Sequence, residues 1–334
     1  MKKEKKITFI GTGAWASALA NVLSHNNYSV VMFGIDQNEI NDINSGYNRK
    51  YFGNRQFTIT KNIRATNNLE EALKDTKIIV FAIPSIAIRS VIKEINKALN
   101  YKKVSVINVS KGFDDDSGEF LSNLIKRKMG NHIKEFATFT GPSYATEVFN
   151  ESLTLINVFA SSKKYSDELI EMFNNSYFKL VPLEDEQGGE LFAALKNVLA
   201  IAAGIISFQF PGKNAESAFI SLGIKEILKI HEQINRPKDL LIGYELVGIG
   251  DIFLTCSSTQ SRNFSFGLAV AEYGLELAIQ KENKTVEGLS TAKTLAKILE
   301  KNKIKDIPLF ESVIQVLLGQ KNPLELTDFL KKQS

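Results

Sequence analysis

The stretch ITFIGTGAWASALANVL, residues 7–23, constrains the fold more than any other part of the chain. A short apolar run predicts a strand, two glycines predict a tight turn, and the alanine-rich run predicts a helix. In this G-x-G-x-x-A spacing, Gly11 permits the turn, Gly13 lets the backbone approach a pyrophosphate, and Ala16 packs the helix on the strand. The unpaired N–H groups at the start of that helix would face the phosphates.

An acidic residue after the next predicted strand supports dinucleotide binding. Asp36 follows VVMFG (30–34) and lies about 20 residues beyond the turn, where a carboxylate binds an adenosine ribose. The basic start MKKEKK and the small residues 16–18 also fit a secretory signal peptide. Because two glycines interrupt the apolar helix that a signal needs, we expect the segment to be retained.

Strand and helix patterns alternate through the first half of the chain. Alternation with continuous apolar strands predicts an α/β fold, a Rossmann-type, mostly parallel sheet covered on both faces. The expected strands are 6–10, 30–34, 77–83, 104–109, 136–140, 153–159 and 177–181.

The second half contains only helical patterns. We therefore expect a dinucleotide-binding α/β domain over residues 1–187 and an all-α substrate and catalytic domain over residues 188–334. The expected helices are 189–208, 214–234, 237–246, 263–273, 289–302, 307–318 and 323–331.

Composition excludes several classes of protein. The 41 basic and 37 acidic residues are spread out, so we expect no nucleic-acid partner. With one cysteine, Cys256, and three histidines, we expect a buried apolar thiol, no disulfide, no metal site and a cytoplasmic location. The longest apolar run, 191–206, is broken by Lys196-Asn197, so we expect no membrane span.

Unusual residues follow several strands at the edge where open parallel sheets bind ligands. The segments are Ile83-Pro84-Ser85, Ser110-Lys111-Gly112 and Thr140-Gly141-Pro142-Ser143. Proline and glycine end strands in many proteins. A lysine between serine and glycine is less ordinary, and Lys111 could bind an anion.

The helical half contains a second group of candidates. Lys196 interrupts an apolar helix, either as a snorkelling side chain or as a proton donor whose pKa is lowered by desolvation. Asp251 could orient Lys196, bind a substrate hydroxyl or cap a helix. Arg262, between Ser261 and Asn263, would begin a helix, where it could bind a phosphate, although serine or asparagine could equally be an N-cap.

Taken together, these segments resemble the bacterial NAD(P)-dependent glycerol-3-phosphate dehydrogenases along nearly the whole chain. The resemblance rests on IGTGAWASALA, FAIPS, VSKGF, TGPSYATEV, ALKNVLAIAAGI, NAESAFISLGI, GIGDIFLTCSSTQSRNFSFG and TVEG, in the family's order.

The resemblance implies interconversion of dihydroxyacetone phosphate and sn-glycerol 3-phosphate, feeding phospholipid synthesis. Lys196 would be the catalytic proton carrier, supported by Asp251 and Lys111. The implied substrate-binding residues are Lys111, Gly141, Ser143, Lys196, Asp251, Ser261, Arg262 and Asn263. The implied cofactor-binding residues are Ala14, Trp15, Lys111, Ala145, Arg262, Val286 and Glu287, beside Gly11, Gly13, Ala16 and Asp36 of the dinucleotide motif.

One departure from the family bears on the cofactor. Ile35 stands where relatives commonly carry arginine or histidine after the second strand. Isoleucine cannot pair with the 2′-phosphate of NADP, and Asp36 would repel it. We therefore expect NAD(H) to be favoured, with NADP(H) as the alternative cofactor.

Two other functions stay open from the sequence. A related two-domain dehydrogenase could act on a 2-hydroxy acid or ketopantoate, and a dinucleotide sensor could bind the cofactor without turnover. The expected partner is a small phosphorylated substrate, and the apolar helical half could also form a homodimer.

Overall fold

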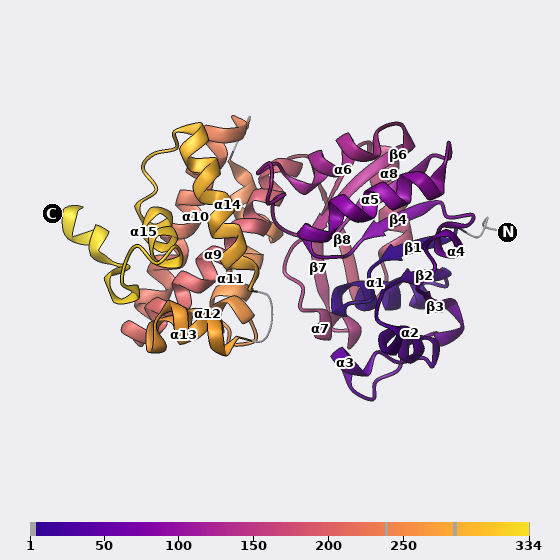
Figure 1. Ribbon diagram of the computed structural model, residues 1–334, viewed down its shortest axis with the longest axis horizontal. Helices are drawn as coiled ribbons and strands as arrows, with labels where there is room; N and C mark the ends of the chain where they lie inside the picture. The colour runs from indigo at the N-terminus through magenta and orange to yellow at the C-terminus, as the bar shows by residue number, and fades with distance from the viewer. Residues whose placement is uncertain (1–4, 238–239, 283–285, 334) are drawn as a thin grey trace. The chain divides into compact units, whose positions relative to one another are not determined.

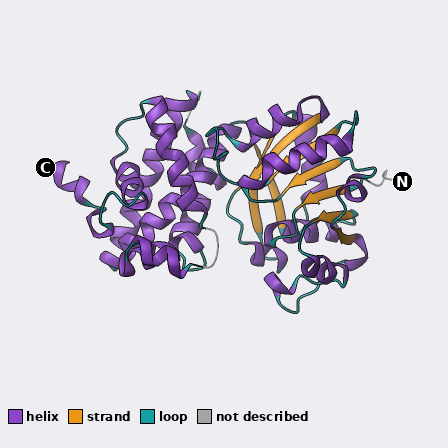
Figure 2. Cartoon of the chain, viewed as in Figure 1, coloured by secondary structure: helices purple, strands orange, loops and turns teal. Residues whose placement is uncertain are grey.

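The computed structural model describes residues 5–237, 240–282 and 286–333, which form two compact units (Figure 1). The first unit comprises Met1–Lys111 with Leu121–Glu186, and the second comprises Gly112–Phe120 with Gln187–Ser334. Figure 2 shows that the sheet belongs to the first unit and that the second is helical. The predicted fold class, an α/β domain followed by an all-α domain, is confirmed.

The first unit is built on an eight-stranded sheet of order β3-β2-β1-β4-β5-β6-β7-β8. All pairs are parallel except β6 with β7. The strands are β1 (Ile7–Ile10), β2 (Val30–Phe33), β3 (Ile63–Thr66), β4 (Ile78–Phe81), β5 (Val104–Asn108), β6 (Ile133–Thr140), β7 (Thr154–Ala160) and β8 (Phe178–Leu183).

Each of the seven expected strands is present, and β3 is an addition. This strand has four residues, and Arg64 exposes its side chain in the middle of it. A stretch of four residues that includes a charged one has neither a continuous apolar run nor a clear alternation of apolar and polar residues. The sequence pattern therefore did not predict β3.

Helices cover both faces of the sheet. One hydrophobic cluster joins the sheet to α1, α2, α7 and α8, and the other joins it to α4, α5 and α6. The helices are α1 (Ala14–His25), α2 (Gln37–Asn44), α3 (Arg49–Phe52), α4 (Leu69–Leu73), α5 (Ser85–Leu99), α6 (Leu121–Met129), α7 (Ala145–Phe149) and α8 (Lys163–Phe173). Residues 7–25 thus form a central strand and a packed helix.

The strand order reverses between β1 and β4. From β1 the chain moves outward to β2 and β3, and then β4 pairs with the other side of β1. Ligands of open α/β sheets bind at the carboxyl ends of the strands where such a reversal occurs. The Gly11-Thr12-Gly13 turn follows β1 at that point.

The second unit surrounds one long apolar helix, α9 (Glu186–Gln209). It is long and apolar enough to cross a bilayer, in contrast to our reading of 191–206, but 89% of its most apolar window is buried inside the protein. That burial is typical of a core helix. The other helices are α10 (Lys213–Asn235), α11 (Asp251–Cys256), α12 (Arg262–Tyr273), α13 (Leu275–Lys281), α14 (Glu287–Asn302) and α15 (Pro308–Leu317).

The structure differs from the predicted helices at two places. The expected helix 237–246 includes residues 238–239, which lie outside the described residues; beyond them the chain forms a 3₁₀ turn (Leu241–Tyr244) and a π-helical turn (Leu246–Gly250). The expected helix 323–331 is two 3₁₀ segments (Pro323–Glu325 and Asp328–Gln333). Helices α11 and α13 were not predicted, since they have only six and seven residues.

Residues 112–120 differ from the predicted domain range. We expected them within the first domain, but they belong to the second unit. The carboxylate of Asp115 accepts hydrogen bonds from Ser290 Oγ at 3.2 Å and Thr294 Oγ1 at 3.3 Å, both on α14. Such an excursion from one unit into another has no signature in local sequence pattern.

Helices α9 and α12 approach each other backbone to backbone. A Cβ atom on Gly204 would collide with the carbonyl of Phe264, and a Cβ on Gly267 would collide with the carbonyl of Ile201. These two glycines therefore allow a contact that no other residue type permits without a shift of the helices. The contact fixes how α9 lies against α12.

Candidate active site

The turn after β1 has the geometry that a dinucleotide requires. Gly11 has φ +125°, and a Cβ there would collide with the carbonyl of Ala82 beside it. Around Gly13, by contrast, nothing lies within 4 Å of the position that a Cβ would occupy. Gly11 is therefore required by the conformation of the turn itself, whereas Gly13 leaves open space beside the backbone.

Helix α1 begins directly after this open space. Its N-cap is Gly13, and no side chain caps it. Ala14 and Trp15 open the helix, while Ala16 is buried in the core, as the packing role of the third motif position requires. Uncapped N–H groups at a helix N-terminus, beside a glycine with free space, fit a pyrophosphate.

Residues far along the chain hold the turn in place. Thr12 Oγ1 donates to Glu39 Oε2 at 2.5 Å, and Asn48 Nδ2 donates to the Thr12 carbonyl at 2.9 Å. Asn48 also donates to Ser17 Oγ at 2.9 Å, which ties the turn to α1. Sequence analysis missed Glu39 and Asn48, because these contacts join residues 27 and 36 positions apart.

We expect Thr12→Val to destabilise the first unit by about 1.5–3 kcal/mol, since a hydrogen bond to a buried charged group is lost. Glu39 is only 8% exposed and would lose one of its hydrogen-bond donors. Urea unfolding followed by Trp15 fluorescence measures the change. Thr58→Val is the matched control, because Thr58 donates to Glu151 at the surface. Equal effects of the two variants would contradict a supporting role for Thr12.

Asp36 lies beyond β2 as the N-cap of α2. Its Oδ1 accepts the backbone N–H groups of Asn38 at 2.9 Å and Glu39 at 3.4 Å. The neighbouring Ile35 is 92% exposed, so it presents an apolar side chain at the end of this strand. The carboxylate is therefore fixed in orientation where the sequence predicted a ribose contact.

The ends of β4 and β5 are tied together beside Lys111. Ser110 Oγ donates to the Ile83 carbonyl at 2.6 Å, and Lys111 follows in a half-buried position. After β6, Ser143 Oγ donates to the Gly141 carbonyl at 3.0 Å, and Ala145 begins α7 and packs on the core. These residues thus all follow carboxyl ends of strands in the first unit.

In the second unit, Lys196 is buried and hydrogen bonded. Its Nζ lies 2.5 Å from Asp251 Oδ1 and 2.9 Å from Thr255 Oγ1, and the lysine is only 7% exposed. It is therefore not a snorkelling side chain. Burial disfavours the charged form of a lysine, whereas a neighbouring carboxylate favours it. The lowered pKa of Lys196 therefore stays a prediction.

An irregular turn directly precedes Asp251. The π-helical segment Leu246–Gly250 runs directly into α11, and π-turns often occur at functional sites. Asp251 is 1% exposed and lies in the first turn of α11 after its N-cap, Gly250, so it faces Lys196 instead of capping the helix. Thr255, one turn later, was missed because nothing separates it in sequence from an ordinary helix residue.

Cys256 lies beside Lys196, with its Sγ 3.9 Å from the Lys196 carbonyl oxygen. It is fully buried, and burial raises the pKa of its thiol. A thiol in that state packs as a small apolar group, as expected from the sequence.

The beginnings of α12 and α14 meet α9 next to Lys196. Asn197 Oδ1 accepts from Asn263 Nδ2 at 3.0 Å, and Asn197 Nδ2 donates to Glu287 Oε2 at 3.2 Å. Asn263 Oδ1 accepts the backbone N–H of Gly288 at 3.0 Å. Asn197, which the sequence left unassigned, therefore links three helices.

Arg262 lies at the start of α12 in this network. Its Nη2 is 3.8 Å from Glu287 Oε1, and its side chain is 56% exposed. Ser261 is the N-cap of α12 and accepts the N–H of Phe264 at 3.3 Å, while the buried Val286 is the N-cap of α14. Lys196 and Asn197 are consecutive residues of α9. The buried Lys196–Asp251 pair therefore lies next to the Arg262 end of α12.

Comparisons with known proteins agree with this arrangement. Residues 6–166 match the family described as NAD-dependent glycerol-3-phosphate dehydrogenase N-terminus, and residues 185–328 match its C-terminus counterpart. Glycerol-3-phosphate dehydrogenase [NAD(P)+] of Malacoplasma penetrans is 45% identical over 325 residues, covering 96% of this chain and 95% of that protein.

Solved structures give the same result. The crystal structure of glycerol-3-phosphate dehydrogenase from Coxiella burnetii superposes with a TM-score of 0.89 at 28% identity, covering 98% of this chain and 99% of that one. A probable 2-dehydropantoate 2-reductase from Bacillus subtilis shares the fold, with a TM-score of 0.58 at 15% identity over 95% of this chain and 100% of that one. The chain therefore belongs to the family of NAD-dependent glycerol-3-phosphate dehydrogenases, which use a nicotinamide cofactor.

Proposed function

We propose that this chain reduces dihydroxyacetone phosphate to sn-glycerol 3-phosphate, with Lys196 as the proton donor. The observation that carries the proposal is the buried Lys196, held by Asp251 and Thr255 next to the Arg262 end of α12. A carbonyl reduction needs a proton donor beside the carbonyl oxygen, and a phosphorylated substrate needs a cation for its phosphate.

The proton step follows from the contacts of Lys196. When bound, a reduced nicotinamide would supply the hydride for carbon 2 of the substrate. Lys196 Nζ gives its proton to the carbonyl oxygen, which becomes the hydroxyl, and the neutral amine takes a new proton from solvent. Asp251 holds the ammonium in line, and Thr255 fixes a second direction around Nζ.

The phosphate of the substrate would bind at the start of α12. Arg262 offers a fork of N–H donors, and Ser261 and Asn263 flank it at the helix N-terminus. The family resemblance also implies substrate contacts for Lys111, Gly141 and Ser143 of the first unit. Val286 and Glu287, together with Ala14, Trp15, Lys111, Ala145 and Arg262, would contact the cofactor, as the family resemblance implies.

The direct test is oxidation of NADH by dihydroxyacetone phosphate. The panel of substrates includes a 2-keto acid and ketopantoate, which represent the related two-domain dehydrogenases. We expect turnover with dihydroxyacetone phosphate alone. Preferred turnover of ketopantoate would contradict the proposal, and cofactor binding without any turnover would favour a dinucleotide sensor.

We expect kcat/KM to be higher with NADH than with NADPH by roughly tenfold, which corresponds to about 1.4 kcal/mol. The physical reason is that Asp36 repels a 2′-phosphate and the exposed Ile35 offers it no charge. Steady-state kinetics with both cofactors at saturating dihydroxyacetone phosphate measures the ratio. A preference for NADPH would show that Asp36 does not control this site.

The product has a clear use if the reaction runs in this direction. sn-Glycerol 3-phosphate is the backbone from which phospholipids are assembled, so the enzyme would feed lipid synthesis in the cytoplasm. A homodimer stays a prediction, which sedimentation of the purified protein tests.

A further inference from the structure

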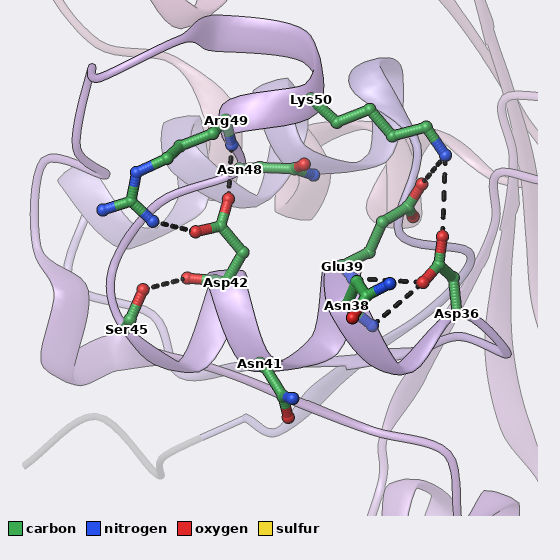
Figure 3. Close-up of a pocket in the computed structure, with 9 residues that line it drawn as sticks. All are labelled: Asp36, Asn38, Glu39, Asn41, Asp42, Ser45, Asn48, Arg49 and Lys50. Carbon is green, nitrogen blue, oxygen red and sulfur yellow. Dashed lines mark hydrogen bonds and ion pairs between the residues drawn. The ribbon is translucent and has the colours of Figure 1, made fainter.

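A polar hollow of about 570 Å³ lies in the first unit, between α2 and the segment that begins α3. Figure 3 shows its lining: Asp36, Asn38, Glu39, Asn41, Asp42, Ser45, Asn48, Arg49 and Lys50. One end contains Asp36, the proposed ribose ligand, with Glu39 and Lys50; we call these three residues the ribose-end cluster. The sequence predicted only the first of them.

The two carboxylates of the ribose-end cluster are fixed. Asp36 Oδ1 accepts two backbone N–H groups of α2, which leaves Oδ2 facing Lys50 Nζ at 3.7 Å. Glu39 is 8% exposed and accepts from Thr12 Oγ1 at 2.5 Å and from Tyr51 Oη at 3.1 Å. Neither acid can turn away without breaking contacts inside the fold.

Lys50 is the movable member of the cluster. Its Nζ donates to Glu39 Oε1, and this hydrogen bond raises the pKa of Lys50, so the side chain is charged at neutral pH. The side chain is 57% exposed. Only the lysine end of the pair is exposed, so the ammonium can turn from Glu39 toward an anion of higher charge in the hollow.

The charges of the cluster bear on the two nicotinamide cofactors. Asp36 and Glu39 carry two negative charges, and Lys50 compensates only one of them. A ribose hydroxyl is neutral and hydrogen bonds well to a carboxylate, whereas a 2′-phosphate carries between one and a half and two negative charges. The second cation of the hollow, Arg49, is paired with Asp42 at the opposite end (Figure 3).

From this arrangement we propose that Lys50 determines how well the enzyme accepts NADPH, by leaving Glu39 and pairing with the 2′-phosphate. With NADH the ammonium stays on Glu39 and Asp36, and Asp36 binds the ribose. The inference rests on the proposed function, since it concerns the same cofactor site. It adds a determinant from outside the strand–turn–helix motif, on the segment that begins α3.

The test is a double-mutant cycle of Asp36→Asn and Lys50→Met, with dissociation constants for NADH and NADPH as the readout. Trp15 is the only tryptophan in the chain and lies in the first turn of α1, so its fluorescence reports cofactor binding without substrate or turnover. Asparagine caps helices as well as aspartate does, so Asp36→Asn retains the start of α2. Methionine retains most of the length of the lysine side chain.

We expect Lys50→Met to weaken NADPH binding by roughly tenfold and NADH binding by less than about threefold, as for loss of one charge pair at a partly exposed site. Asp36→Asn should tighten NADPH binding by roughly tenfold and weaken NADH binding. In the Lys50→Met background, that gain for NADPH should shrink to about threefold, the part that comes from removing the repulsion between Asp36 and the phosphate, because the cation that Asp36 restrains is gone.

Lys163→Met is the matched control. Lys163 is an exposed lysine of the same unit, paired with Asp167 at 2.9 Å, and we expect it to leave both dissociation constants unchanged. Equal weakening of NADH and NADPH by Lys50→Met, or a full gain from Asp36→Asn without Lys50, would overturn the inference. Failure of dihydroxyacetone phosphate turnover with normal cofactor binding would overturn the proposed reaction alone. Binding of neither cofactor would overturn both.

Discussion

Replacing Lys196 with alanine is expected to lower kcat by roughly 10²–10⁴, the usual contribution of a positioned general acid. The proton that the carbonyl oxygen takes up must then come from solvent, since Asp251 and Thr255 remain but neither replaces an ammonium at that position. Single-turnover oxidation of NADH with dihydroxyacetone phosphate measures the effect on the chemical step. The dissociation constant for NADH, read from Trp15 in the other unit, should stay unchanged.

Two further variants separate catalysis from folding. Lys196→Arg keeps a cation against Asp251 but cannot release a proton near neutral pH, so it should lose activity while it retains the ion pair. Lys225→Ala removes an exposed lysine of α10 and should leave kcat as it is. Near-normal turnover in both Lys196 variants would remove Lys196 from the proton step.

Replacing Asp251 with alanine is expected to lower the free energy of unfolding of the second unit by about 3–5 kcal/mol. The loss is large because Lys196 would be left in a buried position without its carboxylate partner. Activity should fall as well, since the ammonium is no longer held in line. Urea unfolding followed by far-UV circular dichroism measures stability, and Trp15 fluorescence reports separately on the first unit.

The double variant Lys196→Met with Asp251→Leu gives the decisive comparison. It replaces both charges by apolar groups of similar size, and such replacements of buried ion pairs are often neutral or stabilising. We therefore expect stability close to that of the unmodified protein together with the full loss of kcat. A double variant as unstable as Asp251→Ala would mean that the pair contributes packing and not only compensation of charge.

The fold was predictable where the sequence pattern is local. Apolar β-branched runs identified β1, β2 and β4–β8, and the G-x-G-x-x-A spacing identified α1 with its turn. The antiparallel pairing of β6 with β7 could not be predicted from the sequence, because the direction of pairing depends on the path of the chain between the two strands. The assignment of residues 112–120 to the second unit was not predictable either, because Asp115 is hydrogen bonded to a helix some 175 positions later.

The site was predictable where a residue is out of place in its surroundings. Lys196 interrupts an apolar helix and Asp251 follows a glycine-rich turn, so the sequence singled out both as candidates, and the structure pairs them. Thr255 looks like any helical threonine. Glu39 and Lys50 look like ordinary surface residues of a polar segment, and only the folded chain shows that one is buried under Thr12 and the other reaches Asp36.

The contact between Gly204 and Gly267 has a consequence for substrate size. Helices α9 and α12 touch there through their backbones and again through Asn197 and Asn263, so two fixed points define the angle between them. The proposed proton donor lies on one helix and the proposed phosphate ligand begins the other. The glycine contact and the Asn197–Asn263 hydrogen bond together therefore set the distance between the proposed proton donor and the proposed phosphate ligand, and we expect a longer phosphorylated ketose to be admitted only if the helix crossing changes.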